Sequence, residues 1–268
     1  MPLMDHLGEL RRRLTIIIVS LFSTAVVLYF ASPTLIQFLM TPVQPYLPPS
    51  LSNLDATATG LYVSSPLEGF TIRFLVAIFF AFVVCFPIVL WEILAFFLPA
   101  LKPNERRWVV PTLAVGCVLF VLGVVFCYLL ILGAAFGWMT GESDAIGTVL
   151  PSAAPYIKTV IGLEIAFGFA FELPLIVFYL IVFNLVPYKT FRKNWRTIYV
   201  VLLVLCAMVT PDASPITMAF MFAALLSLYE VSLLVARLAL SRRIAKQKAE
   251  GTWVEPDEDE DDDEDEDD

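Results

Sequence analysis

The chain has 268 residues, of which 59% are hydrophobic and only 16% are charged, and its mean hydropathy is +0.81. Soluble globular proteins carry about 25% charged residues, so this composition excludes an ordinary soluble enzyme and indicates an integral membrane protein. The formal net charge of −9 arises at the end of the chain, because residues 250–268 hold 14 of the 26 acidic side chains and no Lys or Arg. The rest of the chain therefore carries a net charge of +5.

Six apolar segments are candidate membrane-spanning helices, because about 20 apolar residues cross the roughly 30 Å hydrocarbon core. In chain order they are 14–31, 74–98, 109–132, 160–185, 198–209 and 216–236. The fifth segment would form a helix of only about 18 Å, which indicates a re-entrant segment or a bilayer that thins around it. We count it as a span because the charge pattern requires one there.

Basic residues predict the orientation of these spans. Fifteen of the 17 Lys and Arg side chains fall in four groups, at 11–13, 102–107, 189–196 and 237–248. The positive-inside rule places such groups in the cytoplasm. We therefore expect an all-α integral membrane protein with six spans and with both termini cytoplasmic.

The remaining segments are expected outside the membrane. Residues 32–69 contain six prolines and predict a braced, extended outer cap, and 133–157 predicts an outer loop. We expect the membrane domain to cover residues 1–240. Residues 241–268 should form a disordered cytoplasmic tail, because its acidic run repels itself and cannot bury surface.

Cofactor ligands are scarce. His6 is the only histidine, and the four cysteines lie singly in apolar stretches without a CxxC pair. A zinc or haem site needs several such ligands, so we expect no cofactor and no metal. We expect the lipid bilayer to be a partner and nucleic acid not to be one.

Four acidic side chains fall within the predicted spans, where each costs at least a few kcal/mol. They are Glu92, Glu164, Glu172 and Glu230. Glu92 and Glu230 lie near cytoplasmic ends, where a hydrogen bond or a snorkelling carboxylate explains them as well as a function does.

The fourth predicted span carries two stripes at helical spacing. Glu164, Gly168 and Glu172 share one side of the helix, at i, i+4 and i+8. A second stripe lies about 160° around the helix and contains small residues, namely Gly162, Ala166 and Ala170. We expect the small stripe to pack on the protein's own helices and the carboxylate stripe to face a groove or a partner. Pro174 predicts a kink beside Glu172.

Two further acids lie at the predicted cytoplasmic surface, and both have a structural explanation. Glu9 could form an i, i+4 ion pair with Arg13. Glu105 could stabilise the first turn of the third span, with Asn104 as its cap. Taken without further knowledge, these roles account for both residues.

Five motifs follow one another from residue 6 to about residue 237. In chain order they are His6-Leu7-x-Glu9-Leu10-Arg11-x-Arg13-Leu14, Ser65-Pro66-Leu67-Glu68-Gly69-Phe70, the stretch 96–107 with Pro99 and Glu105-Arg106-Arg107, Phe167-Gly168-x-x-Phe171-Glu172-x-Pro174, and Leu228-Tyr229-Glu230. Together they resemble the TatC family, the core receptor of the twin-arginine protein translocase. The chain departs from the family after the fifth span, where Met218 replaces a glutamine and the acid lies at Asp212.

The resemblance implies a cupped, glove-like bundle in the cell membrane, with short fifth and sixth helices, and a function in transport rather than catalysis. It implies that signal-peptide binding involves Glu9, Arg11, Phe96 and Glu105. Partner docking is implied for Glu172, and we assign Glu164 and Glu230 to the same group of intramembrane polar residues. Structural roles are expected for Pro42, Pro87, Pro99 and Pro174. The implied partners are TatA and TatB single-span proteins, other TatC copies and twin-arginine signal peptides, with the proton-motive force as the energy source.

Two other classes compete with this interpretation. A proton- or ion-coupled transporter would use Glu164 and Glu172 as relay carboxylates, whereas a signal receptor also needs Glu9 and Glu105 in the cytoplasm. An intramembrane enzyme is disfavoured by the lack of a Ser/His or His/Glu constellation.

Overall fold

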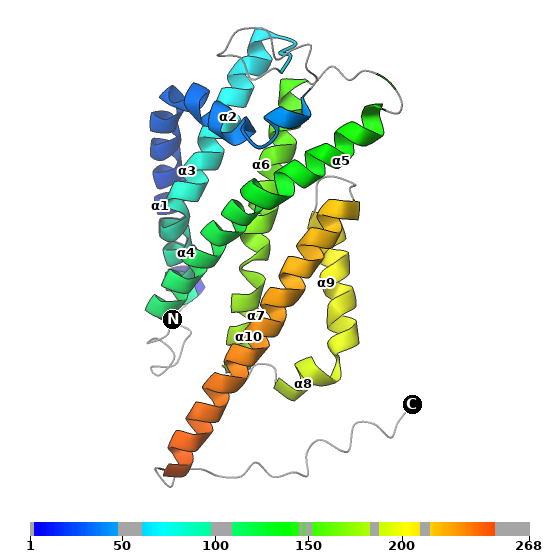
Figure 1. Cartoon of the computed structure of the whole chain (residues 1–268). Helices are drawn as coiled ribbons and strands as arrows, with labels where there is room; N and C mark the ends of the chain where they lie inside the picture. Colours follow the sequence, from blue (N-terminus) through cyan, green and yellow to red (C-terminus); the bar gives the residue numbers. More distant parts are fainter. Residues whose placement is uncertain are drawn as a thin grey trace.

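The computed structural model describes residues 3–47, 61–97, 109–144, 147, 152–182, 188–209 and 215–249, and these are mostly helical (Figure 1). The elements are α1 (Leu3–Phe30), α2 (Ser32–Met40), the 3-10 helix η1 (Gln44–Tyr46), α3 (Pro66–Phe97), α4 (Val109–Phe126), the π-helix η4 (Cys127–Ile131), α5 (Leu132–Asp144), α6 (Ala153–Ala170), α7 (Leu173–Val182), α8 (Tyr188–Lys193), α9 (Trp195–Val209) and α10 (Pro215–Ala249). The predicted all-α membrane class is confirmed.

Within the described ranges, five helical stretches are long and apolar enough to cross a bilayer. They are Leu7–Phe30, Pro66–Phe96, Val110–Ser143, Ala153–Ile181 and Pro215–Leu238. The apolar helix α9 has 15 residues and a length of about 22 Å, which is shorter than the hydrocarbon core. The short fifth helix therefore agrees with the sequence, whereas the expectation of a short sixth helix is wrong, because α10 has 35 residues. The count of six spans stays a prediction.

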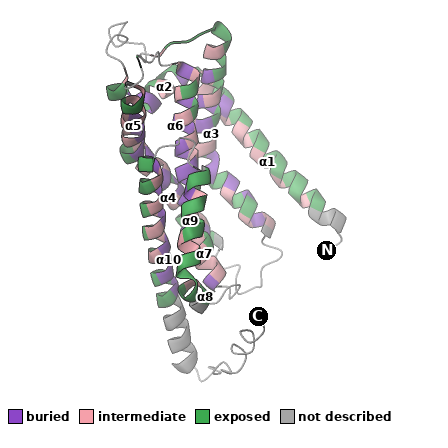
Figure 2. Ribbon diagram, turned by 90° about the vertical axis from the view of Figure 1, so that its right-hand side faces the viewer, coloured by how far each residue is buried: buried purple, intermediate pink, exposed green. Residues whose placement is uncertain are grey.

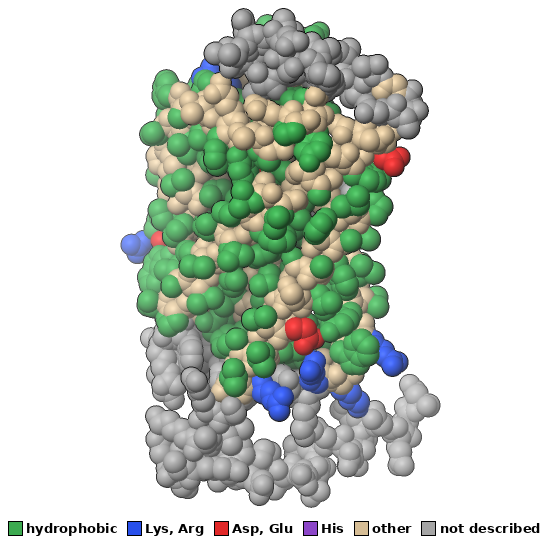
Figure 3. Space-filling model, viewed as in Figure 1, with side chains coloured by type: hydrophobic (Ala, Val, Ile, Leu, Met, Phe, Trp, Pro, Cys, Tyr) green, Lys and Arg blue, Asp and Glu red, His purple; other side chains and the backbone are tan. Residues whose placement is uncertain are grey.

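The helices form an open bundle rather than a closed one. α1 packs along α3 and leans away from the other helices, as Figure 2 shows. α6 lies in the interior against α4, and α7 packs on α10, which also contacts α9. The main core lies where α2, α3, η4, α5 and α6 meet, around Leu39, Phe136 and Phe167, all at most 1% exposed. Much of the remaining helix surface is apolar, as expected for contact with lipid (Figure 3).

The cap that precedes α3 differs in part from the sequence expectation, because its first described part is mostly helical, in α2 and η1, whereas residues 61–65 are not helical. Pro33 lies at the start of α2, where the missing N–H costs nothing and the fixed φ angle suits a helix. Tyr46 of η1 then packs over Gly133 and Gly137. A Cβ atom added to Gly133 would lie 3.5 Å from the Tyr46 hydroxyl oxygen, and one added to Gly137 would lie 2.9 Å from its ring. The cap is therefore anchored on α5, which continues to Asp144 where an outer loop is the expectation.

The four prolines singled out above have different surroundings. Pro42 is half-buried in the turn between α2 and η1, and Pro87 lies inside α3, which continues past it. Pro174 lies at the start of α7, and Pro99 lies outside the described residues. At the end of the chain, α10 extends beyond residue 240 to Ala249, where the sequence suggests a disordered tail; residues 250–268 lie outside the described ranges.

Candidate functional site

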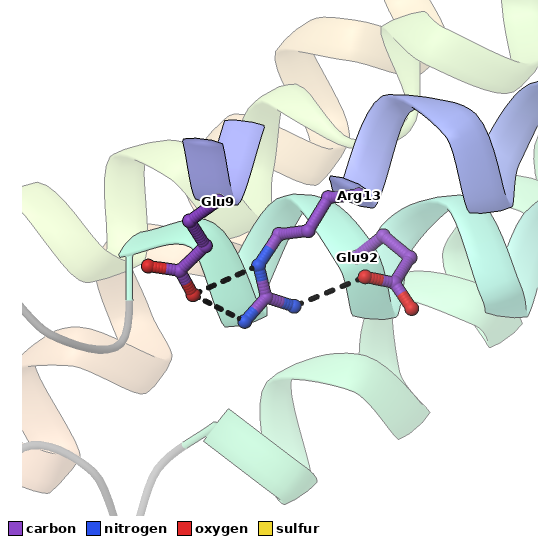
Figure 4. Close-up of polar contacts among 3 residues, drawn as sticks. All are labelled: Glu9, Arg13 and Glu92. Carbon is purple, nitrogen blue, oxygen red and sulfur yellow. Dashed lines mark hydrogen bonds and ion pairs between the residues drawn. The ribbon is translucent and has the colours of Figure 1, made fainter. Parts of the chain in front are cut away.

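A guanidinium held between two carboxylates joins the beginning of α1 to the end of α3. Arg13 donates from Nε and Nη2 to Oε1 of Glu9, at 3.1 and 2.6 Å, and from Nη1 to Oε2 of Glu92, at 3.0 Å (Figure 4). The pair of Glu9 and Arg13 is the i, i+4 ion pair that the sequence predicts. The contact with Glu92 is not predicted by the sequence, because Glu92 lies on α3, 79 residues after Arg13 in the chain.

Packing of α1 on α3 positions this cluster. Thr24 and Cys85 contact each other across the two helices at 3.2 Å, and the Sγ of Cys85 lies 3.7 Å from the carbonyl of Ser20. These small polar side chains allow the helices to run close together. Glu92 then lies on the side of α3 that faces α1, and its whole residue is only 9% exposed.

The other residues predicted for signal binding are placed only in part. Arg11 is exposed on α1, and Phe96 is half-buried one helical turn after Glu92 on α3. Glu105 lies outside the described residues. The structure therefore brings Glu9, Arg11 and Phe96 to the same end of the α1–α3 pair. It also places Arg13 and Glu92 there, which the sequence did not indicate as signal-binding residues.

The carboxylate stripe of the fourth predicted span does not face outward as expected. Glu164 is 2% exposed, and a Cβ atom added to Gly168 would lie 2.6 Å from the ring of Phe120 on α4. The small stripe is also mostly buried, since Ala166 is 8% and Ala170 is 4% exposed. The prediction of one packed and one open face is therefore wrong, because α6 lies inside the bundle and is covered on both sides.

The helix break beside Glu172 agrees with the predicted kink. α6 ends at Ala170, and α7 begins at Leu173, because Pro174 has no N–H to donate to the carbonyl four residues earlier. Glu172 lies in the joint and is half-buried. Its Oε2 would lie 3.3 Å from a Cβ atom added to Gly116, so the side chain points toward α4. The Oε1 atoms of Glu164 and Glu172 are buried and accept no hydrogen bond from the described part of the chain.

Glu230 joins three helices near the basic end of the bundle. It accepts a hydrogen bond from Tyr199 of α9 at 2.7 Å and one from Arg192 of α8 at 3.3 Å. The ion pair with Arg192 is more than one-third exposed on both sides, so it contributes little. The Tyr199 bond is therefore the main polar link between α9 and α10 among the described residues.

At the opposite end, Glu68 connects the starts of α3 and α6. Its Oε2 accepts from the Ser64 N–H at 2.6 Å, and its Oε1 accepts from the Ala154 N–H at 3.1 Å and lies 3.4 Å from the Ser152 hydroxyl. Nearby, Ala153 N–H donates to the carbonyl of Tyr62 at 2.8 Å. Glu68 was visible in the sequence only as part of a motif, since its partners on the α6 side, Ser152 and Ala154, lie more than 80 residues away.

Known proteins resemble this chain over nearly its whole length. The family profile of the Sec-independent protein translocase protein (TatC) matches residues 5–223. Relatives named Sec-independent protein translocase protein TatC include that of Deinococcus radiodurans, which is 32% identical, with 93% of this chain and 90% of the relative covered. The relative from Aquifex aeolicus is 31% identical, with 93% of this chain and 100% of the relative covered. A crystal structure of the twin arginine translocase receptor TatC in DDM superposes with a TM-score of 0.70 at 28% identity, covering 86% of this chain and 99% of that one.

Proposed function

Because the chain belongs to the TatC family of Sec-independent protein translocases, we propose that it receives twin-arginine signal peptides at the end where α1 begins and α3 ends. It is a multi-pass membrane component of a protein transport system. Family membership does not by itself establish the receptor role, which is our proposal. In it, Glu9 and Glu105 are the carboxylates that accept hydrogen bonds from the signal arginines.

The observation that supports this proposal is that Glu9 already binds a guanidinium. In the structure its Oε1 already accepts two hydrogen bonds from one guanidinium, that of Arg13. Arginine is always charged and planar, and a carboxylate at a partly wet surface suits it better than it suits lysine. A side chain that binds an internal guanidinium in this way has the chemistry to bind an external one.

The proposed orientation puts this site in the cytoplasm of the cell. The described basic side chains at the ends of the bundle include Arg11, Arg12 and Arg13 on α1 and Arg192, Lys193 and Arg196 near α8. The positive-inside rule assigns the end of the bundle that carries these basic residues to the cytoplasm, and both termini would then be cytoplasmic. Signal peptides would therefore meet Glu9 before any transport has occurred.

Glu172 is the proposed contact for a single-span partner of the TatA or TatB type. It lies at the break between α6 and α7, where the backbone cannot hydrogen-bond as a regular helix. Its half-buried carboxylate would gain a donor from a partner helix. With the transmembrane potential as energy source, moving one charge across the membrane provides about 2.3 kcal/mol per 100 mV.

The direct test is binding of signal peptides to the purified protein in detergent, with Glu105→Ala as the variant. A hydrogen bond to a charged group is worth about 1.5–3 kcal/mol, so we expect twin-arginine binding to weaken by about ten- to a hundredfold. Glu105→Asp should be milder and Glu105→Lys worse, because lysine repels the signal arginines. Binding should also weaken as salt concentration rises.

The matched control is Glu142→Ala, which removes an exposed acid at the end of α5. It should bind twin-arginine peptide as the wild type does. A twin-lysine peptide should lose less than the twin-arginine peptide in Glu105→Ala. Equal losses for the two peptides, or no loss for either, would assign Glu105 to helix capping instead of recognition.

A further inference from the structure

The internal guanidinium of Arg13 links two carboxylates that belong to different helices. We call Glu9 and Glu92 the carboxylate pair. Arg13 uses all three of its nitrogen positions on this pair, with Nε and Nη2 on Glu9 and Nη1 on Glu92. One guanidinium is therefore enough to span both carboxylates (Figure 4).

Each carboxylate of the pair has a second oxygen that Arg13 does not contact. Arg13 contacts only Oε1 of Glu9 and only Oε2 of Glu92. The other oxygens, Oε2 of Glu9 and Oε1 of Glu92, accept nothing from the residues whose positions are described. Two carboxylates with one arginine also leave an excess of one negative charge.

The degree of burial separates this cluster from an ordinary surface ion pair. The side chains of Arg13, Glu9 and Glu92 are 22%, 26% and 11% exposed. Contacts among such groups are screened less by salt than contacts between fully exposed groups. The exposed quarter of Glu9 still leaves a route from solvent to the pair.

We propose that Glu9 and Glu92 together form an acceptor for a signal-peptide guanidinium, and that Arg13 is the resident occupant with which the incoming arginine exchanges. This inference rests on the proposed function, because it names a further residue of that site. Glu92 lies outside every motif that carries the family resemblance, and its role follows from the contact with Arg13. An incoming arginine offers the same planar set of donors that Arg13 now provides, so the exchange preserves the hydrogen bonds of the pair.

The carboxylate pair would also contribute to the preference for arginine over lysine. A lysine ammonium is a compact point charge on a flexible chain. It cannot reproduce the two-sided, planar contact that links Glu9 to Glu92. Loss of Glu92 should therefore reduce the discrimination between twin-arginine and twin-lysine peptides, and not only the overall affinity.

Two variants break the same ion pair, and the proposal predicts opposite results for them. Glu92→Gln keeps an acceptor oxygen but removes its negative charge, so twin-arginine peptide should bind about tenfold more weakly, as expected for the loss of one charge-assisted contact. Arg13→Gln removes the occupant but keeps both carboxylates, so the same peptide should bind at least as tightly as to wild type. If the ion pair served only to hold α1 against α3, both variants would lose affinity to the same extent.

The measurement is peptide binding to full-length protein in detergent, with thermal unfolding of each variant recorded beside it. An Arg13→Gln variant that binds more weakly than wild type, or a Glu92→Gln variant that binds equally well, overturns the proposal. Where Glu92→Gln alone does not fold, the double variant Arg13→Gln/Glu92→Gln replaces it, because it removes both charges together. It should bind about tenfold more weakly than Arg13→Gln alone, and equal binding also overturns the proposal.

Glu105→Ala in the same assay separates this inference from the proposed function. If Glu105→Ala binds twin-arginine peptide like wild type, the proposed function fails whatever Glu92→Gln does. If Glu105→Ala loses binding while Glu92→Gln does not, only the carboxylate pair is overturned.

Discussion

Single glycines determine how closely α4 approaches its neighbours. A Cβ atom on Gly116 would lie 2.7 Å from Leu90 of α3, and one on Gly123 would lie 2.6 Å from the carbonyl oxygen of Phe167 on α6. Small residues permit this approach in membranes, where dispersion contacts and not the hydrophobic effect drive helix association. The two contacts differ in one respect, since a leucine tip can move and a backbone carbonyl inside a helix cannot.

Gly123→Ala should therefore destabilise the contact between α4 and α6. The added methyl group has to push the two helix backbones apart, at a cost of about 1–3 kcal/mol as in other overpacked cores. Thermal or denaturant unfolding of the purified protein in detergent measures this loss.

The matched control is Gly141→Ala in α5, where an added Cβ meets nothing within 4 Å. Alanine has the higher helix propensity, so this variant should unfold at the wild-type temperature or slightly above it. Equal unfolding temperatures for the Gly123 and Gly141 variants would contradict the close approach of α4 to α6.

At the scale of elements, helix ends are joined by side chains that replace missing backbone partners. Glu68 does this at the start of α6, where it accepts from the Ala154 N–H, because the first N–H groups of a helix have no partner within it. It also accepts from the Ser64 N–H, just before α3 begins. The helix dipole also favours a negative charge at such a position. Glu68 thus holds together two helix starts that are separated by more than 80 residues of sequence.

Glu68→Gln should loosen this junction, because an amide has only one oxygen to replace two that accept on different sides. We expect a lower unfolding temperature and faster hydrogen exchange of the Ala154 amide. Signal-peptide binding should stay unchanged, because Glu68 and Glu92 are separated by about 36 Å along α3. Glu142→Gln serves as the control, and a Glu68 variant that exchanges like this control would show that the junction is held by other contacts.

The whole molecule has two unlike ends, and their assignment to the two sides of the membrane can be tested. Cysteine introduced at Glu142 should react with a membrane-impermeant maleimide added outside the cell, and cysteine at Asn194 should react only after the membrane is opened. Both positions are exposed, whereas Cys85, Cys127 and Cys206 are buried. Removal of the half-buried Cys117 leaves a clean background. The reverse labelling pattern would refute the cytoplasmic position of both termini.

The existence of the spans could be predicted from sequence, because an apolar run of about 20 residues is typical of a membrane-spanning helix. The helix ends could not, because α1 and α10 continue into polar sequence where hydropathy carries no signal. In the site, the contact of Glu9 with Arg13 follows from their spacing of four residues. The contact with Glu92 depends on how α1 packs against α3, and the burial of Glu164 depends on the helices that pack around α6, so neither could be predicted from positions along the chain.

The π-helix η4 makes the long helix from Val109 to Asp144 unusual in its tolerance of changes in length. The Leu132 N–H bonds to the Cys127 carbonyl, five residues back instead of four, so this turn holds one residue more than an α-helical turn. Leu129 and Leu130, 68% and 56% exposed, lie in the widened turn. Loss of one of them would restore a regular helix and leave the faces of α4 and α5 in their present directions. Loss of a residue elsewhere in α4 would rotate the preceding turns by about 100° and separate Gly116 and Gly123 from their neighbours. When related chains differ by one residue in this region, the gap therefore belongs between residues 127 and 131.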